Sequence, residues 1–261
     1  MLGWSINLFR IFGIQLAVHV SFGLLLAYYG WRGWQQAGWL GMAWSVALIV
    51  MFFGCVVLHE LGHSLTARRH GVRVPRILLL PIGGMAEMER IPRRPAAELL
   101  ITIAGPAVNF AIAAVLLPFL WRPLLGLAVV PEYSFLDLLT QLWWGNLIMG
   151  VFNLLPVFPM DGGRILRAIL ACGLPYLRAT WWAATVGRVT ALVLAVVAVA
   201  YFEHLIAGVL FVFIYVAAGA EYRALLLHEQ EEAYWAEVAR RAALVTDPME
   251  PQPPLLSSGP N

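Results

Sequence analysis

The stretch LGMAWSVALIVMFFGCVVLHELGH, residues 40–63, decides the fold of this chain. Its first 19 residues, 40–58, carry no charged side chain, and about 20 apolar residues are enough to cross a bilayer as a helix. Two histidines and a glutamate follow directly, where ionisable groups are costly in lipid and indicate a functional site. The stretch therefore predicts a membrane helix that ends in a polar site.

The composition of the whole chain also indicates a membrane protein. Of its 261 residues, 61% are hydrophobic and 12% are charged, whereas about a quarter of the residues in a soluble domain are charged. All 17 basic residues are arginine and the net charge is +2, with no basic cluster that would attract nucleic acid. The two cysteines, Cys55 and Cys172, form no disulfide framework. The composition excludes disordered, fibrous and disulfide-stapled proteins, and it excludes nucleic acid as a partner.

Apolar segments recur along the chain and predict an α-helical polytopic membrane protein with about six transmembrane helices. The predicted spans are residues 11–29, 40–66, 97–121, 138–159, 184–202 and 205–221. A tight turn at Glu203 and His204 is predicted to join the last two. The uncharged core of the fifth span is only 14 residues long, so that span must include Arg188, whose side chain can reach the interface.

The segment after the second span has a different pattern. Residues 72–90 read VRVPRILLLPIGGMAEMER, with two prolines, a glycine pair and no helical period. This pattern predicts a short extended or β segment in a cytoplasmic loop, with a turn at Gly83 and Gly84.

Three regions are predicted along the chain. Residues 1–222 form the membrane domain. Residues 223–246 are charged with a helical pattern, which predicts a cytoplasmic amphipathic helix, and residues 247–261 are rich in Pro, Ser and Gly, which predicts a disordered tail.

The arginines predict the orientation in the membrane, because short positively charged loops remain in the cytoplasm. The loop 67–96 carries seven arginines and two glutamates, whereas the loop 122–137 carries one arginine and two acidic residues. The first loop is therefore predicted to be cytoplasmic, as is the segment 161–178 with its three arginines. Both termini then lie in the cytoplasm, and the polar site at the end of the second span lies near the cytoplasmic side.

The polar site has the H-E-x-x-H pattern of zinc peptidases. His59 and His63 are four residues apart, so on a helix both imidazoles point to the same side and can share one zinc ion. Glu60 lies beside them as a general base for a zinc-bound water that attacks the peptide carbonyl. The alternative is a chance match in which both histidines face neighbouring helices, but three ionisable groups beside an apolar run make a functional site the better interpretation.

A catalytic zinc ion usually has three protein ligands, so the motif requires a third one at the same membrane depth. Asp161 follows the span that is predicted to run inward, and it therefore arrives at the end of the membrane where His59 and His63 lie. Asp161 could instead cap the helix that follows it. Because the topology and the ligand count agree, we predict that Asp161 is the third ligand.

Together, HELGH at 59–63 and NLLPVFPMDGG at 153–163 resemble the motifs of the site-2 protease family of intramembrane zinc metalloproteases. The resemblance extends to AGPAVN at 104–109, to PIGGMA at 81–86 and to His19, over roughly residues 10–220. The chain is similar to the six-span bacterial and archaeal branch. Many members carry a PDZ domain or a CBS pair, and this sequence predicts neither of them.

The resemblance implies a zinc metalloendopeptidase that uses one Zn²⁺ ion and cleaves membrane-anchored or single-pass protein substrates within or beside a transmembrane segment. It also implies the cell (inner) membrane of a prokaryote as the location. The residues that match the family's zinc ligands are His59, His63 and Asp161, with Glu60 as the catalytic glutamate and Asn153 as the asparagine that holds the substrate carbonyl or oxyanion. Gly83, Gly84 and Asn109 are the predicted substrate-binding residues, although for Asn109 helix packing is the alternative.

Two other functions use the same residues. A zinc-binding transporter or channel would need further ligands across the membrane, and beyond His19 the spans offer almost none. A non-catalytic binder of single-pass membrane proteins has no need of Glu60, which this chain retains.

Overall fold

The computed structural model describes residues 4–89, 92–200 and 205–246, which form six helices and four strands. The strands are β1 (Ser5–Ile11), β2 (Ile14–His19), β3 (Arg76–Leu80) and β4 (Gly83–Glu87). The helices are α1 (Ser21–Arg69), α2 (Pro95–Leu124), α3 (Phe135–Asn153), α4 (Asp161–Ala171), α5 (Tyr176–Ala200) and α6 (Leu205–Thr246). The predicted tail at 247–261 and the predicted turn at Glu203 and His204 lie outside the described residues.

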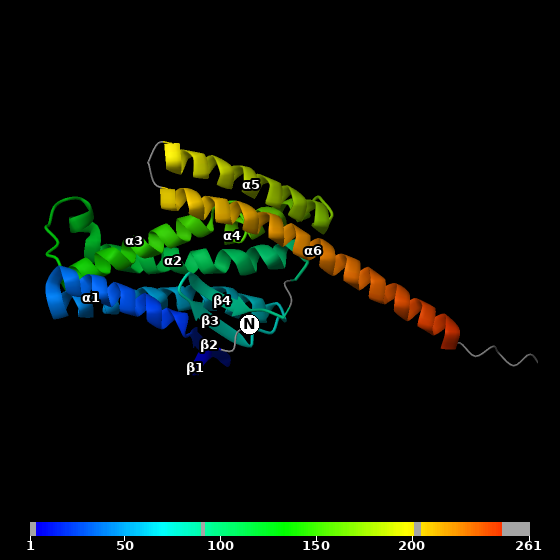
Figure 1. Cartoon of the computed structure of the whole chain (residues 1–261), viewed down its shortest axis with the longest axis horizontal. Helices are drawn as coiled ribbons and strands as arrows, with labels where there is room; N and C mark the ends of the chain where they lie inside the picture. Colours follow the sequence, from blue (N-terminus) through cyan, green and yellow to red (C-terminus); the bar gives the residue numbers. More distant parts are fainter. Residues whose placement is uncertain (1–3, 90–91, 201–204, 247–261) are drawn as a thin grey trace, which may run out of the picture.

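Helix α1 is a pair of antiparallel helical halves joined at Ala37 and Gly38, both of which have non-helical backbone angles. Gly38 has a φ of +58°, in the left-handed region that favours glycine. The halves are in close contact, because a Cβ atom added at Gly33 would lie 2.2 Å from the Gly41 carbonyl oxygen. The chain therefore reverses direction within α1 (Figure 1). Its second half contains the HELGH motif.

The predicted first span, 11–29, begins too early. Ile11 ends β1 and residues 14–19 form β2, so only its second part is helical. A short apolar run suits a buried strand as well as a helix, and periodicity alone does not separate the two. Side chains of β2, notably Ile14 and Leu16, are buried in the same core cluster as Val56 and Val57 of α1. That burial explains why β2 is apolar.

Within the described residues, four helices are long and apolar enough to cross a membrane. The first three are α1, α2 and α5, and the fourth is the part Ala207–Arg241 of α6. The protein is therefore a helical membrane protein with a small sheet. Helix α3 is not among these four, and it includes polar residues such as Asp137, Gln141 and Asn146.

The four strands form one sheet in the order β1-β2-β3-β4, with a parallel pairing between β2 and β3 and antiparallel pairings on either side. Strands β3 and β4 confirm the extended segment predicted after the second span. The turn lies at Pro81 and Ile82 instead of at the glycine pair, so Gly83 and Gly84 begin β4. The sheet lies at one end of the helical body, and β4 is one of its two edges (Figure 1).

The helices form a chain of contacts that places the site. Helix α2 packs against α1, α3 and α4, α4 also packs against α5, and α5 packs against α6. Helix α2 thus lies between the histidine-bearing α1 and the short α4. Helix α6 is continuous across residue 222, and its C-terminal part extends away from the body (Figure 1).

Candidate metal centre

The second half of α1 presents His59 and His63 towards α2, and both are buried, at 3% and 6% exposure. Glycines create the space for them where the two helices cross. A Cβ atom at Gly62 would lie 2.7 Å from the Ala104 carbonyl oxygen of α2. A Cβ atom at Gly105 would lie 2.2 Å from His63 Nε2, so a larger residue there would fill the space in front of the imidazoles.

Asp161 completes the group of predicted ligands. It begins α4, and its Oδ2 atom lies 3.3 Å from His59 Nε2 and 3.2 Å from His63 Nε2. The two Nε2 atoms are 3.1 Å apart. The structure thus brings His59, His63 and Asp161 together around one point, as predicted from the motif and the topology.

The three ligand atoms fit a zinc ion. With bonds of about 2.0–2.1 Å, neighbouring ligand atoms of a tetrahedral zinc ion are about 3.3 Å apart. The Oδ2 atom of Asp161 is buried and has no hydrogen-bond partner within the described residues. To act as a metal ligand, the carboxylate of Asp161 must be ionised.

Both imidazoles are held by their second nitrogen. His63 Nδ1 donates to the Ile101 carbonyl oxygen at 2.7 Å, and His59 Nδ1 donates to Asn109 Oδ1. Asn109 in turn donates to Asn146 Oδ1 at 3.0 Å. Because an amide or carbonyl oxygen only accepts, each Nδ1 carries the proton and each Nε2 keeps its lone pair for a metal ion.

This arrangement includes groups that the sequence analysis did not predict. Asn146 and the Ile101 carbonyl were not expected near the site, although a buried asparagine in the middle of an apolar helix is a recognisable signal. Asn109 is fully buried between His59 and Asn146. Its predicted contact with substrate stays a prediction.

Strand β4 passes beside the predicted catalytic glutamate. A Cβ atom at Gly84 would lie 2.6 Å from Glu60 Cγ and 3.1 Å from Val56 Cγ1, so only glycine fits there without a shift. At Gly83 no atom lies within 4 Å of such a Cβ, but its φ of +141° also favours glycine. Glu60 itself is partly buried.

Asn153 is the last residue of α3, and its side-chain amide donates to the Met149 carbonyl oxygen at 3.0 Å. It is half-buried. Its predicted role at the substrate carbonyl stays a prediction.

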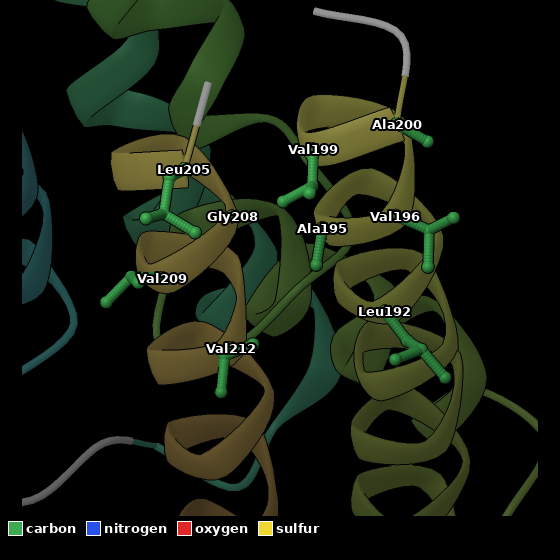
Figure 2. Close-up of a pocket in the computed structure, with 9 residues that line it drawn as sticks. All are labelled: Leu192, Ala195, Val196, Val199, Ala200, Leu205, Gly208, Val209 and Val212. Carbon is green, nitrogen blue, oxygen red and sulfur yellow. The ribbon is translucent and has the colours of Figure 1, made fainter. Parts of the chain in front are cut away.

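A pocket of about 500 Å³ lies between α5 and α6, and Figure 2 shows its side chains. All its lining residues are apolar, and none of them is a predicted ligand or catalytic residue. They are Leu192, Ala195, Val196, Val199, Ala200, Leu205, Gly208, Val209 and Val212. The pocket therefore offers no metal ligand, and the chemistry belongs to the cluster at α1, α2 and α4.

Comparisons with known proteins agree with this geometry. The model of peptidase family M50 matches residues 47–125 and 128–197. The zinc metalloprotease MJ0392 of Methanocaldococcus jannaschii is 44% identical over 193 residues, which are 74% of this chain and 53% of that protein. The putative zinc metalloprotease Rip3 of Mycobacterium tuberculosis is 33% identical over 225 residues, which are 80% of this chain and 56% of that protein. The chain thus spans about half the length of these curated relatives.

One solved structure is similar to this chain, and the similarity covers nearly the whole length of the solved chain. The site-2 protease from Methanocaldococcus jannaschii has a TM-score of 0.59 and 39% sequence identity to this chain. The match covers 84% of this chain and 95% of the solved one.

Proposed function

The chain belongs to peptidase family M50, and from this premise we propose that it is an intramembrane zinc metalloendopeptidase of the site-2 protease type. The observation that carries the proposal is the buried cluster of His59, His63 and Asp161, whose ligand atoms lie 3.1–3.3 Å apart. Glu60 follows the first of these ligands directly in the motif. A buried ligand set beside a free carboxylate suits hydrolysis of a peptide bond.

Each residue of the site has its own task in the proposed reaction. When bound, the zinc ion supplies Lewis acidity, which lowers the pKa of water and polarises a carbonyl group. The carboxylate of Glu60 accepts a proton from the attacking water and then passes it to the leaving amine. Asn109 and the Ile101 carbonyl hold the two imidazoles in one orientation and one tautomer. The amide of Asn153 donates a hydrogen bond to the substrate carbonyl as negative charge develops there.

The substrate must present an extended backbone to these groups. A transmembrane helix has its carbonyl groups bonded internally, and each group that unwinding leaves unpaired in lipid costs several kcal/mol. Strand β4 is a sheet edge whose Gly84 lies against Glu60. We propose that an unwound substrate pairs with this edge, with Gly83 and Gly84 allowing close approach of its backbone.

We place the protein in the cell (inner) membrane of a prokaryote with six crossings. The two halves of α1 supply two crossings, and α2, α3, α5 and α6 supply one each. An even number of crossings puts both termini on the same side, and the arginines in residues 67–96 indicate that this side is the cytoplasm, with the metal centre near it. Its substrates are single-pass or membrane-anchored proteins.

The test is cleavage of a panel of tagged single-span proteins by the purified protein in detergent. We compare wild type with Glu60→Gln at equal zinc content, and we use Glu132→Gln, an exposed glutamate in the loop after α2, as the matched control. Wild type and Glu132→Gln are expected to cut, whereas Glu60→Gln is expected to bind zinc without cutting. Cleavage by Glu60→Gln at the wild-type rate would overturn the proposal. Zinc flux into liposomes without any cleavage would favour a transporter instead.

A further inference from the structure

An ion pair is buried between α2 and α4, outside the metal centre. Arg167 Nη2 lies 2.6 Å from Glu98 Oε1, and Arg167 Nε donates to the same oxygen at 2.8 Å. The two side chains are 3% and 0% exposed. Neither residue was predicted to have a function from the sequence.

Stability alone is a poor explanation for this pair. Moving each ion out of water costs several kcal/mol, and replacing a buried pair by apolar residues is often neutral or stabilising. The second oxygen of Glu98, Oε2, is buried without a hydrogen-bond partner within the described residues. Charged groups that are buried within a membrane protein are usually kept for function.

The position of each partner along its helix links the pair to the metal centre. Glu98 lies one turn before Ile101, whose carbonyl oxygen accepts the hydrogen bond from His63. Arg167 lies less than two turns after Asp161 in the 11-residue helix α4. The pair therefore joins the helix that orients one metal ligand to the helix that carries another.

The start of α4 and the loop before it form one packed unit. A Cβ atom at Gly162 would lie 2.1 Å from the Leu155 carbonyl oxygen, and one at Gly163 would lie 2.6 Å from the Phe158 backbone nitrogen. The loop and the first turn of α4, which includes Asp161, are therefore in close contact. A polar contact that fixes α4 also fixes Asp161.

The Arg167 guanidinium is itself held from several sides. Its Cζ atom lies 5.1 Å from the ring centre of Phe158, in the loop before α4, and 5.1 Å from that of Tyr176, at the start of α5. Its Nη1 atom lies 3.3 Å from Glu221 Oε1 of α6. One side chain thus ties α4 and its loop to α2, α5 and α6, with the shortest contact made to α2.

We propose that Glu98 and Arg167 are positioning residues for the metal centre. They hold α4 at the spacing from α2 that brings Asp161 within 3.3 Å of both imidazoles. The inference rests on the proposed function, because it assigns the two residues a task at the zinc site. Without the pair, Asp161 loses its fixed position and the site binds zinc more weakly.

The main test is the double variant Glu98→Met/Arg167→Met, which removes both buried charges. Glu221 loses its ion-pair partner, but its side chain is 33% exposed. Zinc affinity is measured by competition with a chromophoric chelator, and the ligand geometry by the visible absorption of the cobalt-substituted protein. We expect about 10- to 100-fold weaker zinc binding, the size of effect seen when groups that orient metal ligands are lost. The cobalt spectrum is expected to change as well.

The matched control is Arg188→Met, another arginine in the helical body. It is exposed, and its guanidinium stacks on Tyr215 of α6 and donates to the hydroxyl of that residue. It thus shares the aromatic contact of Arg167, but its described contacts do not reach α4. Its zinc affinity and cobalt spectrum should equal those of wild type.

A second variant covers the case in which the double variant does not fold. Arg167→Lys keeps the positive charge but loses the forked pair of contacts to Glu98. We expect it to fold and to bind zinc several-fold more weakly than wild type. Wild-type affinity together with an unchanged cobalt spectrum, in whichever variant folds, would overturn the inference. Because no substrate is involved, a wild-type protein that binds no metal would instead refute the zinc site and the proposed function.

Discussion

At the scale of single residues, the contact between Gly84 and Glu60 has the most direct consequence for catalysis. A methyl group at position 84 would lie 2.6 Å from Glu60 Cγ, so Gly84→Ala must displace the glutamate or the strand. We expect at least a tenfold loss of kcat for cleavage of a single-span substrate, because a base that is displaced by about 1 Å can lose a factor of about 10². Zinc affinity should stay within about twofold of wild type, since the three atoms nearest to the new methyl group belong to Glu60 and Val56 and not to the proposed zinc ligands.

The matched control for this prediction is Gly54→Ala in α1, where no atom lies within 4 Å of the new methyl group. It should cleave at the wild-type rate. Equal rates for Gly84→Ala and Gly54→Ala would contradict the placement of β4 against Glu60, the proposed catalytic glutamate.

The residues that the sequence predicted are those fixed by local spacing. His59 and His63 share a side of one helix because four residues make about one turn, and Asp161 followed from a count of membrane crossings. No spacing in the sequence predicted that Asn146, Glu98 and Arg167 would lie at or near the site. Their contacts depend on where α2 crosses α1 and α4, which no short motif encodes.

At the scale of elements, the crossing of α1 and α2 sets the size of the site. Gly62 brings the two helices together, because a Cβ atom there would lie 2.7 Å from the Ala104 carbonyl oxygen and 2.9 Å from Val108 Cγ2. Gly62→Val should therefore force the helices apart and lower the free energy of unfolding by about 1–3 kcal/mol, the usual cost of overpacking. Zinc content should fall too, since the imidazoles move with α1.

Thermal unfolding in detergent and zinc content after purification check this prediction. Gly54→Val serves as the control, because it places the same side chain on the same helix in open space. If Gly62→Val matches Gly54→Val in both measurements, the close crossing of α1 and α2 is refuted.

Some of the strands and helices were predicted from the sequence, and others were not. Strands β3 and β4 were expected because prolines and glycines interrupt the apolar pattern between residues 72 and 90. Strands β1 and β2 were not expected, since β2 is apolar enough to pass for the start of a membrane helix. The sequence predicted a loop between the spans 11–29 and 40–66. In the structure the helix continues through most of that segment, and the chain reverses direction only at Ala37 and Gly38.

At the scale of the whole molecule, the two ends of the helical body differ in charge. The sheet and the extension of α6 lie at one end, and the reversal of α1 and the loop between α2 and α3 lie at the other (Figure 1). Seven arginines fall in the loop 67–96 and one in the loop 122–137. Because short arginine-rich loops remain in the cytoplasm, the end with the sheet should face the cytoplasm.

Cysteine labelling tests this orientation. In a background that lacks Cys55 and Cys172, single cysteines are placed at three exposed positions: His70 after α1, Val129 between α2 and α3, and His228 in α6. A membrane-impermeant maleimide is expected to label Val129→Cys in intact spheroplasts, and His70→Cys and His228→Cys only in inverted vesicles. Labelling of Val129→Cys and His228→Cys from the same side would contradict the six crossings. Labelling of all three from the opposite sides to those expected would keep the fold but reverse the orientation, and the metal centre would then open to the outside, beyond the reach of cytoplasmic water.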